Sequence, residues 1–225
     1  AGFFSVVHAI YFEQFPGLRE KLQKYHDETV KLIQVNDIDV VDYGMVETNA
    51  AAFEIANRME GDKLDVTFCN MITYATSSVF APIIQKASTP MILLALQPLK
   101  GLDYKLANTM MQLENDNICS VPEFTGVANR MGKKIADVII GTLYDDEIAQ
   151  KEIKEWCDIA KVLHSLKGAR IGLMGHVLEA MYDMHADPTA VSAAFGLHVP
   201  LLEIEDFVEE YNKVTDDEIA SKVEL

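Results

Sequence analysis

Two apolar runs, residues 64–70 and 90–96, constrain the fold of this 225-residue chain more than any other feature. The second run, Pro90-Met-Ile-Leu-Leu-Ala-Leu96, has almost no alternation between apolar and polar residues. Such a run is typical of a strand in a parallel sheet, because helices cover both faces of that sheet. Between the runs, residues 77–86 carry apolar side chains at helical spacing. The whole stretch predicts a right-handed strand–helix–strand crossover that buries Val66, Phe68, Ile92, Leu93 and Leu94.

The residues before this crossover repeat the same alternation of strand and helix. Asn49 is expected to cap the helix that leads into the central strand. The pattern indicates an α/β fold, a doubly wound parallel sheet in three layers of the Rossmann-like kind. The predicted elements are a strand over 3–9, a loop over 8–14, a helix over 18–32, a strand over 38–46 and a helix over 50–59.

Helices dominate the prediction after Leu96. One is expected over residues 102–113, and a second is expected to start at Pro122 and run to about Leu143. A third is expected to start at Asp145 and run to Leu166, with charges on its outer face.

A new strand-and-helix pattern begins at Lys167-Gly168. It predicts a strand over 169–174, a loop or short helix over 175–184, a helix over 188–195 and a strand over 197–202. We therefore expect an amino-terminal domain over 1–167 and the beginning of a second α/β domain, incomplete, over 168–225, because so few residues cannot bury a core of their own. Thr215-Asp-Asp-Glu218 reads as a capping box that opens a helix just before the end, which predicts the amino-terminal part of a longer protein.

Charge and cysteine content narrow the function classes. A net charge of −16 argues against a nucleic-acid partner, since no basic patch is present to displace phosphate counterions. The three cysteines, Cys69, Cys119 and Cys157, are widely spaced, so we expect neither a disulfide framework nor a zinc site. The apolar runs have the length of strands and no signal peptide is recognisable, which favours a cytoplasmic protein without a membrane partner.

Polar and aromatic residues follow the predicted strands, at the edge where parallel sheets collect ligands. Neutral hydrogen-bonding groups beside aromatic rings suit a polyhydroxylated ligand, and no glycine-rich phosphate motif is present. For any single residue, the alternative is a loop side chain satisfied by backbone or water. The residues are His8, Tyr11, Gln14, Glu47, Asn70, Thr73, Tyr74, Gln97, Asn117, Ser120, Glu123, His176, Tyr182 and Asp183.

One stretch concentrates potential metal ligands: His176, Asp183, His185 and Asp187. It lacks a nearby pair of glutamates, so we expect it to shape a loop and to hold no metal. Paired carboxylates elsewhere, such as Asp145-Asp146, fall on charged helical faces. The sequence therefore assigns no catalytic residue and no metal ligand to this chain.

Three stretches resemble the L-arabinose isomerase and L-fucose isomerase superfamily. They are residues 6–18, the central unit through Asn117-Ile-Cys-Ser-Val-Pro-Glu-Phe124, and residues 172–187 followed by Phe195-Gly-Leu-His-Val199. The resemblance implies the amino-terminal part of a three-domain, metal-dependent sugar isomerase. In that family a divalent ion, usually manganese, and two glutamates interconvert an aldose and a ketose, and these groups lie in the later domains.

The resemblance also implies which residues meet the sugar. It implies that this chain forms one wall of a sugar pocket. The pocket would belong to a neighbouring subunit of a homo-oligomer, a trimer or hexamer. By position the wall contains Ile10, Phe12, Tyr74, Asn117, Ser120 and Leu178, and His176 joins them from the polar residues that follow strands.

Two departures from the family pattern bear on the substrate. Arabinose isomerases proper have a glutamine where this chain has Ile10, and a histidine followed by two glycines where it has Ser120-Val-Pro122. Loss of a polar group that meets a hydroxyl redirects specificity, so L-arabinose does not follow as the substrate. The alternative function is a non-catalytic sugar-binding or sensing α/β module.

Overall fold

The computed structural model describes residues 1–223, which form two compact units, one over 1–161 and one from 162 onward. The division falls inside a long helix, and each unit is described by itself. The domain limit expected after Lys167 stays a prediction.

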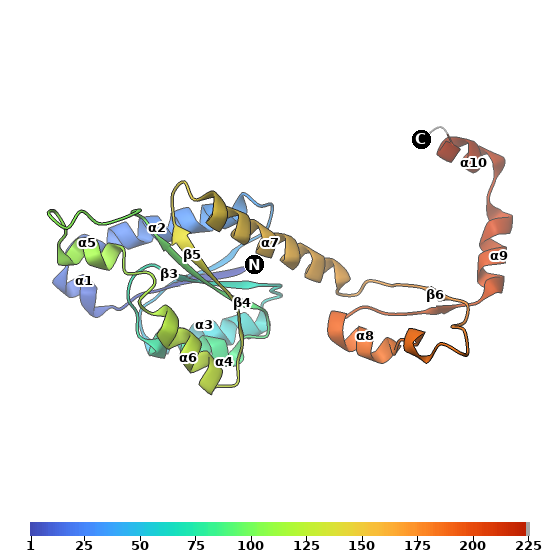
Figure 1. Ribbon diagram of the computed structural model, residues 1–225, viewed down its shortest axis with the longest axis horizontal. Helices are drawn as coiled ribbons and strands as arrows, with labels where there is room; N and C mark the ends of the chain where they lie inside the picture. The colour runs from blue at the N-terminus through green and yellow to red at the C-terminus, as the bar shows by residue number, and fades with distance from the viewer. Residues whose placement is uncertain (224–225) are drawn as a thin grey trace. The chain divides into compact units, whose positions relative to one another are not determined.

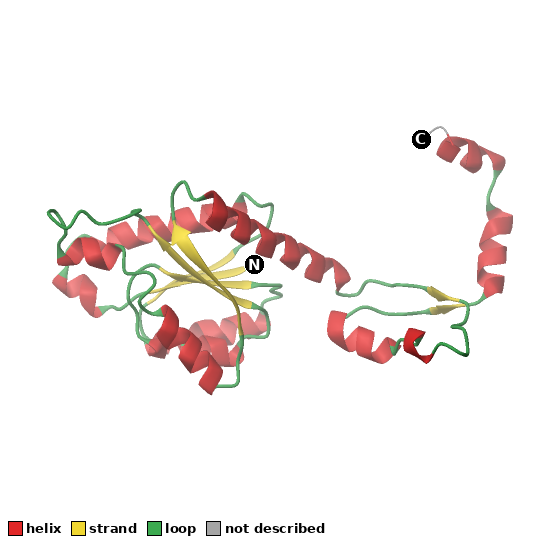
Figure 2. Ribbon diagram, in the orientation of Figure 1, coloured by secondary structure: helices red, strands yellow, loops and turns green. Residues whose placement is uncertain are grey.

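The first unit is built on a five-stranded sheet in which all neighbouring strands are parallel (Figures 1 and 2). The chain passes outward from β1 to β2, returns to β3 and continues to β5, so the order reverses between β1 and β3. This is one of the common doubly wound orders, and it confirms the predicted fold class. The order is β2-β1-β3-β4-β5, with β1 at Gly2–Val6, β2 at Val41–Val46, β3 at Thr67–Met71, β4 at Met91–Gln97 and β5 at Ile135–Thr142.

Helices cover both faces of this sheet and complete three layers (Figure 1). The helices α2 (Leu18–Gln34) and α7 (Glu147–Leu166) lie on one face. The other face is covered by α3 (Asn49–Gly61), α4 (Ala81–Lys86) and α6 (Val121–Arg130).

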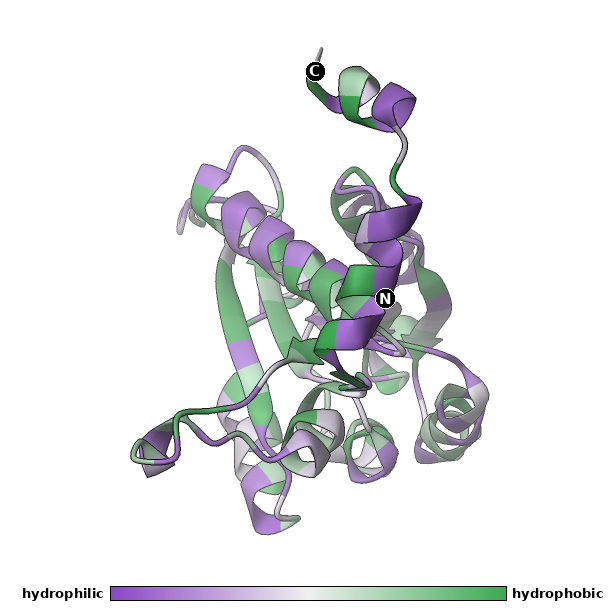
Figure 3. Ribbon diagram, turned by 90° about the vertical axis from the view of Figure 1, so that its right-hand side faces the viewer, coloured by the Kyte–Doolittle hydropathy of each residue, from purple (hydrophilic) through white to green (hydrophobic). Residues whose placement is uncertain are grey.

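The core lies between these layers, as the pleat of the strands requires. Neighbouring residues of one strand point to opposite faces, so Phe3 packs under α2 and α7 while Phe4 packs under α3, α4 and α6. The five residues expected in the core, Val66, Phe68, Ile92, Leu93 and Leu94, are all buried, which confirms that prediction. Figure 3 shows the same division, with apolar strands inside and α7 alternating between polar and apolar residues.

A chain of polar groups, buried except for Asp42 at its outer end, links α2 to the sheet. His26 Nδ1 lies 2.8 Å from Ser5 Oγ, and its Nε2 lies 3.0 Å from an Asp42 carboxylate oxygen. Asn70 donates to Ser5 Oγ at 3.2 Å and to Thr29 Oγ1 at 3.3 Å. A histidine with its hydrogen on Nε2 donates to Asp42 and accepts from Ser5, so every bond in the chain has a donor and an acceptor.

The prediction of one continuous helix from Pro122 to about Leu143 is wrong. The helix α6 ends at Arg130, and Gly132 turns the chain with a φ of 68°, a conformation that favours glycine. The residues that follow form β5, which pairs with β4 from Ile135 to Thr142. Its β-branched side chains favour an extended strand over a continued helix.

Three smaller predictions also differ from the structure. The loop over 8–14 contains a short helix, α1 (Ile10–Gln14), and the helix over 102–113 forms only as α5 (Thr109–Glu114). Thr48, not Asn49, caps α3 by accepting a hydrogen bond from the Ala51 amide at 3.2 Å. Asn49 instead donates to the Ser78 carbonyl oxygen at 2.8 Å.

The second unit contains a parallel pair of two-residue strands and three helices. The strands predicted over 169–174 and 197–202 pair over Leu173–Met174 (β6) and Leu201–Leu202 (β7), with a further bridge between Arg170 and His198. Gly196 ends α8 (Pro188–Phe195) with a φ of 70°, as expected. A short 3₁₀ helix (Tyr182–Met184), α9 (Ile204–Lys213) and α10 (Asp216–Val223) complete it.

The predicted capping box of α10 is present. The Glu218 amide donates to Thr215 Oγ1 at 3.3 Å, and the Thr215 amide donates to the Glu218 carboxylate at 2.9 Å. Among residues 1–223, no helix has the length and apolar content that crossing a membrane requires.

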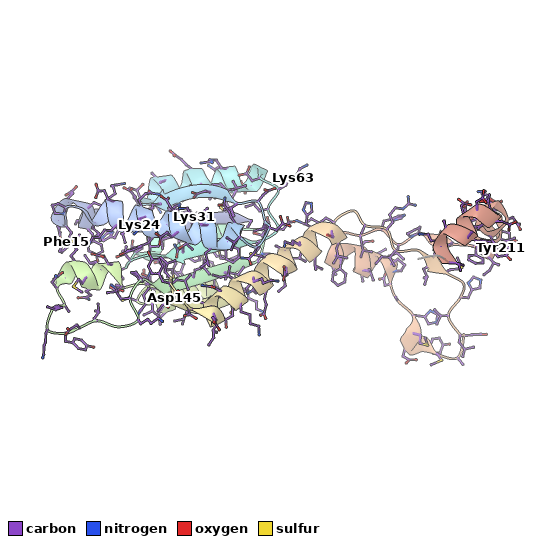
Figure 4. All side chains as sticks on the ribbon, turned by 90° about the horizontal axis from the view of Figure 1, so that it is seen from above. Phe15, Lys24, Lys31, Lys63, Asp145 and Tyr211 are labelled. Atoms are coloured by element: carbon purple, nitrogen blue, oxygen red, sulfur yellow. The ribbon has the colours of Figure 1, made fainter. Side chains whose placement is uncertain are left out.

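Replacing His26 tests the polar chain under α2. In a His26→Leu variant the buried Ser5 hydroxyl loses its acceptor and Asp42 loses a donor, so the free energy of unfolding should fall by about 2 kcal/mol. Lys24→Ala is the matched control, because Lys24 lies on the exposed face of the same helix (Figure 4) and should change stability by less than about 0.5 kcal/mol. Urea denaturation measures both, and equal stabilities for the two variants would contradict the assignment.

Candidate functional site

Three loops meet at the carboxyl edge of the sheet, beside the point where the strand order reverses. They are the loop with α1 after β1, the loop after β3 that leads into a 3₁₀ helix (Ser77–Val79), and residues 115–120 before α6. Ligands of doubly wound sheets bind at this position. The predicted residues Ile10, Phe12, Tyr74, Asn117 and Ser120 all lie on these loops.

Electrostatic interactions link five titratable side chains, four from these loops and one from the first turn of α6, and we call them the edge cluster: Tyr11, Tyr74, Asp116, Cys119 and Glu123. The negative charge of Glu123 is the largest cause that raises the pKa of Tyr74, followed by partial burial. Loss of hydration raises the pKa of Tyr11, and the nearby Tyr74 and Asp116 add to this rise. The influence of each group on the others shows that the loops bring these side chains together.

Asp116 and the exposed Cys119 interact within the edge cluster. Loss of hydration raises the pKa of the half-buried Asp116, and a hydrogen bond with Cys119 partly offsets that rise. Loss of hydration and the charge of Asp116 raise the pKa of the Cys119 thiol. A thiol with a raised pKa is a poor nucleophile, so Cys119 is poorly suited to nucleophilic catalysis.

Phe12 is held by a neighbouring ion pair. The guanidinium carbon of Arg19 lies 4.2 Å from the centroid of the Phe12 ring. The same guanidinium binds both carboxylate oxygens of Glu47, one of them at 2.7 Å. A planar guanidinium fixed on two sides holds the ring in place, whereas Ile10 at the start of α1 is 47% exposed.

Ser120 is fully buried and fastens the loop after β3. Its Oγ donates to the Ala75 carbonyl oxygen and accepts from the Ala75 amide, both at 2.9 Å. This pair of bonds ties the start of α6 to the residue next to Tyr74. The hydroxyl thus contributes to the edge by shaping the loop.

Two buried oxygens near the same edge lack partners. Asn117 donates to the Leu96 carbonyl oxygen at 3.1 Å, but within residues 1–223 neither its Oδ1 nor Thr73 Oγ1 has a hydrogen-bond partner. Buried polar atoms of this kind are usually satisfied by ordered water or by a bound group.

Sequence reasoning found part of this cluster. It placed Tyr11, Tyr74 and Glu123 after strands but missed Asp116 and Cys119. Their position beside Asn117 was the available signal. His176 and Leu178 belong to the second unit, where both are exposed, Leu178 by 64%.

Comparison with known proteins connects this chain to sugar isomerases. It is 22% identical over 149 residues to an L-arabinose isomerase of Bacillus subtilis (strain 168), which covers 66% of this chain and 30% of that enzyme. This chain resembles L-arabinose isomerases. A second, from Pediococcus pentosaceus (strain ATCC 25745), is 22% identical over 215 residues, 89% of this chain and 45% of that enzyme. No protein-family model matches the sequence.

These matches confirm the resemblance found in the sequence. The chain spans less than half the length of the two arabinose isomerases that it matches.

The described residues do not fit a resident metal. Within residues 1–223, no three histidine, cysteine, aspartate or glutamate side chains are gathered in a way that could hold an ion. The stretch from His176 to Asp187 is included in this finding, and the three cysteines are free.

A Ser120→Ala variant tests the fastening of the loop after β3. The change leaves the buried amide and carbonyl of Ala75 without their shared partner, so the free energy of unfolding should fall by about 1–3 kcal/mol. Ser78→Ala is the matched control, because its exposed hydroxyl contacts only Thr76 in the same loop. Thermal denaturation compares them, and a Ser120 variant as stable as the control would show that the bonds are dispensable.

Proposed function

We propose that this chain is the amino-terminal part of an aldose–ketose isomerase and forms one wall of its sugar pocket. The edge cluster carries the proposal: tyrosines from the loops after β1 and β3 converge with Asp116 where doubly wound sheets bind ligands. The similarity to two L-arabinose isomerases supports the same conclusion. In this proposal residues 1–167 are one domain and residue 168 begins the next.

The edge cluster has the chemistry that a sugar requires. Tyrosine rings can cover the carbon-bound hydrogens of a sugar, and their hydroxyls can bond to its oxygens. Asp116 can accept hydrogen bonds from hydroxyl groups. The carboxylates of Asp116 and Glu123 favour an uncharged sugar over a phosphorylated one, since like charges repel.

The reaction itself is assigned outside this chain. We propose that the longer protein uses a divalent metal, manganese, and a pair of glutamates. The resemblance to arabinose isomerases supports placing these groups in the later domains of the longer protein, so we assign no catalytic step to this chain. In the first unit, Ile10, Phe12, Tyr74 and Asn117 are proposed to bind and orient the sugar, while Ser120 shapes the loop that carries Tyr74. For the second unit, taken by itself, His176 and Leu178 remain proposed sugar contacts.

The proposed setting is a cytoplasmic homo-oligomer, a trimer or hexamer, in which this wall faces the active site of a neighbouring subunit. The net charge of −16 supports a small neutral ligand and gives no support to nucleic acid or an anionic membrane surface as a partner.

A non-catalytic sugar-binding or sensing module is the second candidate. The same edge cluster favours this function, because it can bind a sugar without catalysing a reaction. Reading the codons after Leu225 separates the two functions. Downstream glutamates and histidines at isomerase spacing favour the enzyme, and an immediate stop codon favours the module.

Activity measurements test the assignment of the chemistry. The 225-residue chain with added Mn²⁺ should convert no aldose to ketose, because its described residues, 1–223, gather no set of metal ligands. The protein expressed from the complete reading frame should convert an aldose under the same conditions. Ketose formation is followed colorimetrically, with the metal-free protein as the control. Turnover by the isolated chain would contradict the proposal.

A Tyr74→Ala variant of the complete protein tests the pocket wall. Losing the ring should raise KM for the sugar about 10-fold, or about 1.4 kcal/mol, and leave kcat within about 2-fold, because the reacting groups lie elsewhere. Tyr104→Ala is the matched control, since Tyr104 is 91% exposed and does not belong to the edge cluster. An unchanged KM together with a large loss of thermal stability would assign Tyr74 to packing alone.

A further inference from the structure

Arg19 connects the ends of two neighbouring strands at the carboxyl edge of the sheet. It lies in the first turn of α2, and its guanidinium donates to both carboxylate oxygens of Glu47, the residue that directly follows β2. The guanidinium carbon also lies 4.2 Å from the ring centroid of Phe12, which belongs to α1 in the loop after β1. One side chain therefore contacts both the residue after β2 and an aromatic ring of the loop after β1.

The bond to Glu47 fixes the orientation of the guanidinium as well as its position. Two hydrogen bonds from one planar group to one carboxylate define a plane, which a lysine ammonium cannot do. The side chains of Arg19 and Glu47 are 48% and 25% exposed, so solvent screens their charges and the pair adds little to stability. The pair therefore matters more for the geometry it gives its neighbours than for its own free energy.

The Phe12 ring is also held by apolar packing. It packs against a buried cluster that includes Val7, Leu18 and Leu22. The side chain nevertheless remains partly exposed at the edge where doubly wound sheets bind ligands. The apolar cluster and the guanidinium together restrict the orientations of the ring, and part of its surface stays available for contact.

We propose that Arg19 is a positioning residue that holds the Phe12 ring in the orientation in which it meets the ligand, an inference that rests on the sugar-wall role proposed above. Phe12 has no polar side-chain atom, so its part is to cover carbon-bound hydrogens of a sugar. Arg19, fixed by Glu47, acts through this ring and does not itself bind the sugar. Without the guanidinium, the ring must be ordered when the sugar binds, which weakens binding.

Two substitutions separate the planar group of Arg19 from its charge. Arg19→Ala removes both, whereas Arg19→Lys keeps a positive charge beside Glu47 but has no plane. A positioning role predicts that each variant raises KM about 5-fold and leaves kcat within about 2-fold. A KM that lysine restores would overturn the proposal, because charge alone would then suffice. Lys24→Ala is the matched control, since Lys24 is an exposed cation of the same helix (Figure 4) and should leave KM unchanged.

A double-mutant cycle tests whether Arg19 acts through the ring. Phe12→Leu keeps an apolar side chain but removes the aromatic face. In the Phe12→Leu protein, a further Arg19→Ala change should alter KM by less than about 2-fold, because the ring that Arg19 positions is already absent. Titration calorimetry of sugar binding measures the same cycle without turnover. Equal effects of Arg19→Ala in both proteins would overturn the proposal, since Arg19 would then act by another route.

The experiment uses the protein from the complete reading frame, with L-arabinose, D-xylose and L-fucose as the probes. Its outcomes separate this inference from the proposed function. If Phe12→Leu weakens sugar binding and Arg19→Ala does not, the sugar wall stands and the positioning role fails. If a sugar binds and Phe12→Leu leaves its binding unchanged, the ring does not meet the ligand and the positioning role also fails. If none of the three sugars binds, the sugar wall fails and this inference fails with it.

Discussion

The central strands must satisfy their backbone hydrogen bonds through one another, because the helices above and below keep water away. Strand β1 pairs with β3 residue by residue, from Gly2 with Thr67 to Val6 with Met71. Their carboxyl ends are therefore level, and the loops that leave them start side by side. The position of Tyr11 beside Tyr74 follows from this register.

Polar groups placed within this apolar environment add specificity to the fold. Ser5 and Asn70 occupy buried positions of the two central strands. Burying a smaller apolar residue there would cost less free energy than burying a polar side chain. On α2, His26 accepts a hydrogen bond from Ser5, and Thr29 accepts one from Asn70. An α2 rotated or shifted by one residue would leave these groups unpaired, so the network selects one position of the helix.

Similar reasoning explains what the sequence could and could not predict. The buried strands β3 and β4 were predictable because continuous apolar runs are hard to place elsewhere. The edge strand β5 was missed for two reasons. It is only partly buried, and its apolar residues come so soon after an amphipathic helix that they look like a continuation of that helix. Tyr74 could be placed from its position after a strand. The position of Asp116 could not be predicted, because its proximity to Tyr11 depends on how residues 98–114 fold back to the sheet. The sequence has no periodic pattern that indicates the path of these residues.

The second unit differs from the first in how much apolar surface it hides. Among its described residues, Leu197 is the one large apolar side chain that is buried, at 5% exposure, whereas the first unit encloses dozens. The heat capacity change of unfolding scales with the apolar surface that becomes hydrated. In calorimetry of this chain, almost all of that change would therefore come from unfolding of the first unit.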